Sequence, residues 1–127
     1  MPEYFYIKQN DRRPALRAIL KLKNSVYVAE VLAPGGSSGD GTGTALDLSD
    51  ASVDFIMYDL VTGTEKVNAD ATIVTATSGL VQYSWAAGDT DTVGTYYGEF
   101  EITYADSTTL TCPNDEHIVV KVTAELG

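Results

Sequence analysis

Apolar and polar residues alternate in short runs along most of the chain, and this pattern constrains the fold more than any other feature. Successive side chains of a β-strand point to opposite faces, so each run predicts a strand with one face on a core. The clearest runs span residues 16–23, 53–58, 67–74, 81–85, 96–102 and 118–122. Residues 12–23 are the one stretch that could be helical, and they alternate as well. We therefore expect an all-β protein without helices.

Turn-forming residues separate these runs, most clearly at Thr62-Gly63, Ser78-Gly79 and residues 113–115. Turns spaced by about ten residues are typical of an antiparallel sandwich or barrel. Residues 4–9 add a predicted edge strand, and residues 110–112 add a short one. The side chains that alternation assigns to the middle of the core are Leu20, Phe55, Trp85, Tyr96, Phe100 and Val120.

Length and composition set the scale of this fold. The chain has 127 residues, of which 44% are hydrophobic, which is enough to form the core of one domain. Cys112 is its only cysteine, so an intrachain disulfide is excluded and core burial must stabilise the fold. The sequence shows neither a signal peptide nor an apolar run of about 18 residues. We expect a single domain over residues 1–127, made in the cytoplasm and without a membrane partner.

Residues 24–44 interrupt the regular spacing of strands and turns. Residues 26–32 are apolar and could form a strand, whereas residues 34–44 contain five of the eleven glycines and no large side chain. A segment of this composition cannot order itself by burial, so we expect a mobile loop at the end of an inserted β-arm. Such an arm is either an inert insertion or a segment that orders on a neighbouring subunit.

Charge is strongly negative and unevenly distributed. The net charge is −10, which argues against a nucleic-acid partner because phosphates would be repelled. Residues 1–23 nevertheless hold six of the eight basic groups and only two acidic ones, a local +4 that leaves −14 for the remainder. These basic side chains are either a solvated face or one half of a head-to-tail contact between copies, in which charge selects orientation.

The residues that usually carry chemistry are sparse. His117 is the only histidine, so a nucleophilic site would have to combine it with Cys112, and a zinc site with four nitrogen or sulfur ligands is excluded. Calcium needs only oxygen ligands, which could come from Asp89, Asp91 and Asp115 or from Asp47 and Asp50, but the spacing of a calcium-binding loop is missing. We predict no catalytic residues, no metal and no cofactor.

Tyrosines are the remaining candidates for function. Alternation leaves Tyr58 and Tyr97 facing outward, where they could contact a protein or stack on a sugar. The N-terminal strand and the arm could pair with another chain, because an unpaired sheet edge invites such pairing. The predicted interface residues are Tyr4, Tyr6, Lys8, Arg12, Arg13, Tyr27, Val28, Tyr58 and Tyr97.

The segment Asp91 to Gly98 resembles a corner of immunoglobulin-like domains, in which a tyrosine hydroxyl binds the backbone upstream. Tyr96 would be that tyrosine, and Gly98 stands where those domains carry a cysteine. The resemblance implies an immunoglobulin-like antiparallel β-sandwich that lacks the disulfide.

The order of several segments is similar to the N-terminal domain of baseplate upper proteins of lactococcal-phage type. The matching pieces lie between residues 7 and 122: 8–11 with Pro14, 46–48, 53–55, 79–85, 89–90, 94–96, 99–100 and 113–115 ahead of Ile118. This resemblance implies a bacteriophage virion protein, made in the cytoplasm of the host bacterium, that acts as a tail or baseplate attachment or adaptor module. Its partners would be other phage structural proteins and copies of itself. A decoration protein of the capsid or neck, or an immunoglobulin-like carbohydrate-binding or adhesin module, is the alternative.

Overall fold

The computed structural model describes residues 3–36 and 41–126. This part of the chain is all-β, as the alternation predicted, with ten strands, one short 3-10 turn and no disulfide. The elements are β1 (Glu3–Lys8), β2 (Leu16–Lys23), β3 (Val26–Val31), β4 (Thr44–Ala45), β5 (Ser52–Asp59), β6 (Glu65–Thr75), η1 (Ala76–Ser78), β7 (Leu80–Tyr83), β8 (Gly94–Thr103), β9 (Thr109–Cys112) and β10 (Ile118–Thr123). Within those ranges no helix is both long and apolar enough to cross a membrane.

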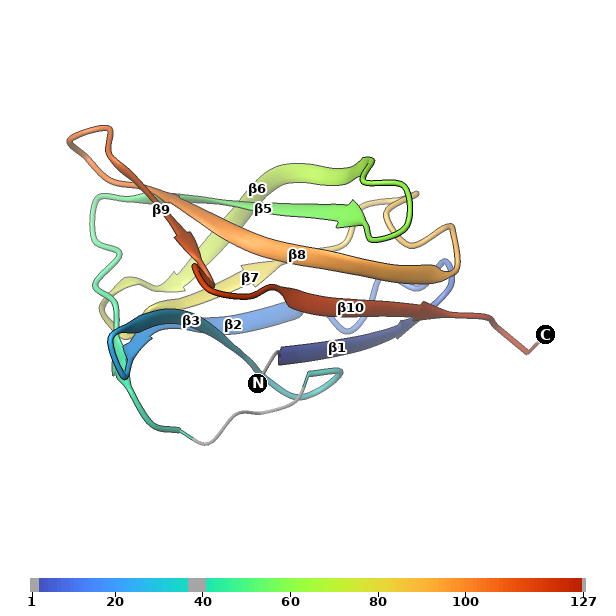
Figure 1. Cartoon of the computed structure of the whole chain (residues 1–127), viewed down its shortest axis with the longest axis horizontal. Helices are drawn as coiled ribbons and strands as arrows, with labels where there is room; N and C mark the ends of the chain where they lie inside the picture. The colour runs from blue at the N-terminus through green and yellow to red at the C-terminus, as the bar shows by residue number, and fades with distance from the viewer. Residues whose placement is uncertain (1–2, 37–40, 127) are drawn as a thin grey trace.

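The strands follow one hydrogen-bonded path, β1-β10-β8-β5-β6-β7-β2-β3, with β9 attached to β8 and β4 attached to β2. The first part of β6, up to Ala71, pairs with β5, and its second part, from Thr72, pairs with β7 with a bulge between Ile73 and Thr75. This strand therefore connects two layers, which enclose the core (Figure 1). We call the layer of β1, β10, β9, β8, β5 and the first part of β6 sheet A, and the layer of β7, β2, β3, β4 and the rest of β6 sheet B.

One pair of strands departs from the predicted antiparallel arrangement. β1 lies parallel to β10, with Phe5 opposite Val120, whereas every other strand pair in the described ranges is antiparallel. The first and last strands are not joined by a turn, so no short connection forces them to run in opposite directions. Alternation within each strand could not reveal this direction.

The core lies between the inner faces of the two sheets. The six side chains assigned to its middle from the sequence, listed above, are 0–2% exposed. Phe55 on β5 is the centre of an aromatic cluster, with ring centroids 4.9 Å from Tyr83, 5.9 Å from Trp85 and 5.1 Å from Phe100. Because β5 and β8 belong to sheet A and β7 to sheet B, these rings join the two sheets.

The alternation fails near the end of β2. Leu22 is 39% exposed although it follows Leu16, Ala18 and Leu20 at the inward positions, and Lys21 is only 5% exposed. Leu22 lies opposite Tyr27 and Thr44, at the end of the sheet and beyond the core. Lys21 faces away from the core but is covered, and its ammonium group contacts Glu30 of β3 and donates to the Thr42 carbonyl oxygen at 2.8 Å.

The strand expected at residues 26–32 is present, but it belongs to a sheet and does not form a separate arm. Residues 26–31 form β3, which pairs with β2 along its whole length, and Ala29 and Val31 are buried in the core. The strand is thus a regular part of sheet B. Of the predicted mobile loop, residues 37–40 lie outside the described part of the chain, whereas Gly36 bridges to Phe5 and Thr44 pairs with Leu22.

The corner expected at the start of β8 is present. The Tyr96 hydroxyl donates a hydrogen bond of 2.7 Å to the Thr92 carbonyl oxygen, four residues upstream. Burial raises the pKa of this hydroxyl, so it remains a neutral donor around neutral pH. The bond fixes the direction in which the chain enters β8, the strand at the middle of sheet A (Figure 1).

Candidate interaction surface

Aromatic side chains line up across the solvent-facing side of sheet A. Tyr58 on β5 is paired with Tyr97 on β8, Tyr97 with Val119 on β10, and Val119 with Tyr4 on β1. All four residues occupy the outward positions of their strands, since their sequence neighbours Met57, Tyr96, Val120 and Phe5 are buried. We call Tyr58, Tyr97, Val119 and Tyr4 the aromatic row.

The rings at the β5 end of this row contact one another and His117. Tyr97 stacks on the imidazole at 4.8 Å between ring centroids with an interplanar angle of 12°. Tyr58 meets both rings edge-on, at 6.3 Å from Tyr97 and 6.0 Å from His117. Burial, and then the negative charge of Glu99, raise the pKa of the Tyr58 phenol, so it stays a hydrogen-bond donor at neutral pH.

The β1 end of the row is also built from contacting rings. Tyr4 and Tyr6 stack at 6.2 Å with an interplanar angle of 10°, and the ammonium group of Lys121 lies 5.8 Å from the centre of the Tyr4 ring. Cation-π contacts of this kind hold a lysine against a ring. Tyr6 keeps 52% of its surface exposed, which is the largest value among the aromatic residues named so far.

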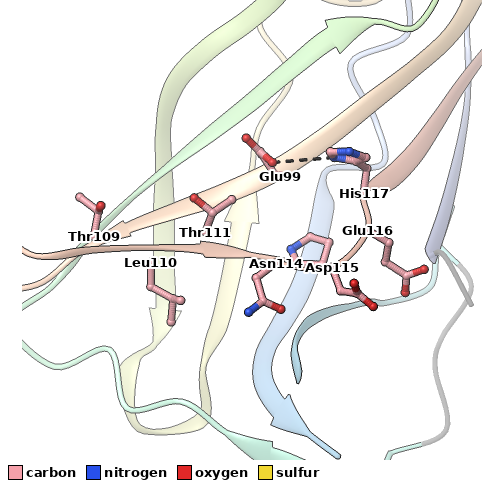
Figure 2. A pocket seen from close by; sticks show the side chains of 9 residues that line it. Glu99, Thr109, Leu110, Thr111, Asn114, Asp115, Glu116 and His117 are labelled. Carbon is pink, nitrogen blue, oxygen red and sulfur yellow. Dashed lines mark ion pairs between the residues drawn. The ribbon is translucent and has the colours of Figure 1, made fainter. Parts of the chain in front are cut away.

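A pocket of about 320 Å³ opens beside the aromatic row. Figure 2 shows Glu99 and His117 pointing toward each other, with the His117 Nδ1 atom 3.8 Å from a Glu99 carboxylate oxygen. The other lining residues come from β9 and from the loop that leads into β10: Thr109, Leu110, Thr111, Pro113, Asn114, Asp115 and Glu116. Three carboxylates and several hydroxyl and amide groups therefore surround a space without lysine or arginine in its lining.

Three more carboxylates lie side by side on the same face. Asp54 on β5 is paired with Asp70 on β6 and with Glu101 on β8. Like charges directly opposite each other destabilise a sheet. Partial burial raises the pKa of Asp54, and the hydrogen bond with Asp70 and the charges of Asp70 and Glu101 raise it further. We call these three residues the acidic row.

The structure brings five of the predicted interface residues together. Tyr4, Tyr6, Lys8, Tyr58 and Tyr97 all occupy outward positions on sheet A, on three strands that lie far apart in the sequence. Tyr58 and Tyr97 were expected to point into solvent, but they are only partly exposed because they contact each other and His117.

Arg12, Arg13, Tyr27 and Val28 lie elsewhere. Arg12 and Arg13 are exposed in the loop before β2, where the Arg12 side chain donates to the Trp85 carbonyl oxygen at 2.9 Å. Tyr27 and Val28 lie on β3, outside sheet A. These four residues therefore do not extend the aromatic row.

The edges proposed for pairing with another chain are partly engaged. On β1, the Tyr6 amide donates to the Gly35 carbonyl oxygen at 2.9 Å. On β3, Tyr27 exchanges two hydrogen bonds of 3.1 Å with Asn114, and the Val31 amide donates to a Glu3 carboxylate oxygen at 2.8 Å. Since edge strands invite pairing only where their amides and carbonyls are unbonded, the sheet face is the better candidate for an interface.

The potential catalytic and metal-binding residues are tied into the fold. Cys112 is fully buried, and burial raises the pKa of its thiol to about 12, so it is not a thiolate at neutral pH. Asp89 accepts from Tyr83 and from the Ala86 amide, and Asp91 pairs with Lys66 at 2.6 Å. In the described residues, no three histidine, cysteine or acidic side chains are placed to hold a metal ion.

Sequence reasoning missed the contribution of His117, Glu99 and Lys121 to this surface, and it missed the acidic row. Alternation gives the outward face of each single strand, so it could place Tyr97, Glu99 and Glu101 on one side of β8. It could not give the register between strands, which alone brings Asp54 beside Glu101 and Tyr4 into line with Tyr97.

Comparison with known proteins adds no assignment to this surface. No model of a known protein family matches the chain, and no curated protein matches it either. The structure shows a disulfide-free all-β fold.

Proposed function

We propose that this protein is a non-catalytic binding domain that acts as a tail or baseplate attachment or adaptor module of a bacteriophage particle. The observation that carries the binding role is the aromatic row, which crosses four neighbouring strands on the solvent side of sheet A. Tyrosine is enriched at protein interfaces because it combines a large apolar ring with a hydrogen-bonding hydroxyl. The order of segments described above supports the virion context, and the Tyr96 corner supports kinship with immunoglobulin-like domains.

The ring geometry favours a protein partner over a sugar. A sugar-binding platform presents an exposed ring face for stacking, but one face of Tyr97 is covered by the His117 imidazole and Tyr4 is stacked on Tyr6. The rings form two clusters on either side of Val119, and this combination of aromatic and aliphatic side chains suits the apolar centre of a protein interface. A carbohydrate-binding or adhesin module is the alternative, and binding to a glycan array that is lost on Tyr97→Ala would support it.

The virion role is tested by locating the protein. Particles from the bacterium that encodes the chain would be induced, purified on a density gradient and analysed by mass spectrometry. The protein should be found in the particle fraction, in a fixed ratio to the other structural proteins, and should stay there after a high-salt wash. Recovery only in the soluble fraction would contradict the proposal.

The role of the surface is tested in the same particles. A Tyr58→Ser/Tyr97→Ser variant should fold but fail to enter the particle, because two of the three rings of the aromatic row are removed. A Tyr104→Ser variant is the control, since Tyr104 lies at the β8–β9 turn and is not a member of the row; because Tyr104 packs against the core, thermal unfolding would first show that both variants are folded. Equal incorporation of the double variant and the control would contradict the assignment of this face.

A further inference from the structure

A second line of side chains borders the aromatic row. The Leu60 amide donates to the Thr95 carbonyl oxygen at 3.1 Å. Thr95 is paired with Lys121, and Lys121 is paired with Tyr6. Each of these four residues lies two positions along its strand from a member of the aromatic row, so the two lines are about 7 Å apart. Leu60 and Tyr6 are exposed, and they extend the apolar surface toward the end of the sheet.

Two further aliphatic side chains adjoin this end of the face. Val61 lies in the β5–β6 turn and is 89% exposed, and Val93 is exposed just before β8. The two segments lie at the same end of the molecule (Figure 1). Four of the seven exposed large hydrophobic residues in the described part of the chain therefore gather here. Exposed apolar residues that cluster in this way mark an interaction site. We call the aromatic row with Tyr6, Leu60, Val61 and Val93 the apolar half of the face.

The acidic row occupies the other half of the same face. It lies four residues from the aromatic row along both β5 and β8, a separation of about 13 Å. None of the ion pairs of the described residues includes a member of the acidic row. Lys8 and Lys121, which occupy outward positions on β1 and β10, lie on the far side of the aromatic row. The face is thus apolar at one end and negatively charged at the other.

Charge complementarity decides which partner suits this face. The apolar half determines where a partner docks, and the acidic row disfavours any partner that places carboxylates opposite it. A second copy is poorly suited, because the chain has a net charge of −10 and its Lys21 and Lys66 are already paired with carboxylates. A different protein with lysine or arginine at the matching place would gain attraction instead.

We propose that this face binds a different protein of the particle, whose surface presents an apolar patch opposite the aromatic row and lysine or arginine side chains about 13 Å away, opposite the acidic row. This inference rests on the proposed function, because it names the chemistry of the partner of the same surface. The apolar half supplies most of the affinity, whereas the charges fix the orientation in which the partner docks.

Carboxyl labelling of purified particles tests the acidic half. A water-soluble carbodiimide with glycine ethyl ester converts accessible carboxyl groups to amides, and mass spectrometry of the digested protein gives the labelled fraction at each residue. Asp70 is exposed and Glu101 is partly exposed in the isolated domain, so both should be labelled there and should lose most of this labelling in particles. Asp47 is the control, because it is exposed beside Leu46, whose amide is bonded to β2 of sheet B, and its labelling should not change.

Photo-cross-linking in the same particles identifies what covers the apolar half. Tyr6 would be replaced by p-benzoylphenylalanine, which keeps an aromatic ring and bonds covalently to whatever contacts it on illumination. The cross-link should join this position to another structural protein, close to lysine or arginine residues of that protein. The same replacement at Leu126, which is fully exposed outside the strands, is the control and should give no cross-link.

A matched pair of variants tests the charge in the assembly itself. Glu101→Lys should fold, because it relieves the repulsion in the acidic row, but it should lower incorporation into particles by about tenfold or more, since a cation then faces a cation. Glu125→Lys makes the same change at an exposed position outside the strands and should leave incorporation unchanged. Thermal unfolding would show that both variants are folded.

Three results would overturn the inference. They are undiminished labelling of Asp70 and Glu101 in particles, a cross-link from position 6 to another copy of this chain or to nothing, and equal incorporation of Glu101→Lys and Glu125→Lys. In each case the wild-type protein is still a component of the particle, so the proposed function stands. Absence of the wild type from particles would instead overturn the proposed function and this inference together.

Discussion

The buried ion pair between Lys21 and Glu30 offers the sharpest test of the energetics of this fold. The two side chains are 6% and 10% exposed, lie on neighbouring strands of sheet B and contact each other directly. The Lys21 ammonium group also donates a hydrogen bond of 2.8 Å to the Thr42 carbonyl oxygen, which connects residue 42 to the sheet. The Lys21→Met substitution keeps the length of the apolar stem but leaves Glu30 buried without its partner.

The expected cost follows from burial. Removing one member of a buried ion pair destabilises a protein by about 3–5 kcal/mol, because the other charge remains uncompensated. The stability of a chain of 127 residues is about 6–19 kcal/mol at the usual 0.05–0.15 kcal/mol per residue. The loss is therefore a large share of the total and corresponds to a fall in Tm of about 12–20 °C. Replacing both residues in Lys21→Met/Glu30→Met removes the stranded charge and should restore stability to within about 1 kcal/mol of the wild type.

Urea unfolding followed by tryptophan fluorescence measures these differences, since Trp85 is the only tryptophan and is 2% exposed. Lys66→Met is the matched control, because it breaks the more exposed pair with Asp91, whose side chains are 25% and 50% exposed, and should cost less than about 1 kcal/mol. A Lys21→Met variant that loses no more than Lys66→Met would refute the reasoning, and so would a double variant as unstable as the single one.

Other consequences of the structure can be measured in the same way. Tyr96→Phe removes the hydroxyl at the corner and should cost about 1 kcal/mol in urea unfolding; an unchanged midpoint would show that the bond contributes nothing. Gly98→Ala places a Cβ 2.9 Å from the Phe55 ring and should cost about 1–3 kcal/mol of unfolding free energy through overpacking. Gly63→Ala is the control, because its Cβ meets no atom within 4 Å and the substitution tests only the backbone strain of a positive φ of 71°. Cys112 should not react with a thiol reagent at pH 8 until the protein unfolds, because burial raises its pKa to about 12; rapid labelling of the native protein would contradict its burial. Asp54→Asn should stabilise the domain at pH 7 by a few tenths of a kcal/mol, and this gain should shrink as the pH falls and the carboxyl of the wild type becomes protonated.

The sequence was sufficient wherever a property depends on the local spacing of residues. Phe55 and Phe100 could be assigned to the core because the side chains of one strand alternate between its two faces. The tyrosine corner was expected from the resemblance of residues 91–98 to a corner of immunoglobulin-like domains, and the structure shows that its hydrogen bond joins Tyr96 to Thr92, four residues upstream. The absence of an intrachain disulfide required nothing more than one cysteine.

The same local argument failed where the surroundings of a residue decide its burial. Leu22 occupies an inward position of β2 but lies beyond the end of the core. Lys21 occupies an outward position but is buried together with Glu30. Residues 26–32 were predicted to belong to an inserted arm, because no sequence pattern shows that Ala29 and Val31 are buried in the core. In each case the missing information was which other segment lies above the strand.

Sequence alone determined the all-β class, the main strands, the centre of the core and the choice of outward tyrosines, because these follow from the order of residues along one strand. Only the tertiary structure decided the path of the sheet, the parallel pairing of β1 with β10 and the register that assembles the aromatic and acidic rows. The physical reason is that pairing between strands is set by contacts over long sequence separations, so neighbours such as Tyr4 and Val119 leave no local signal.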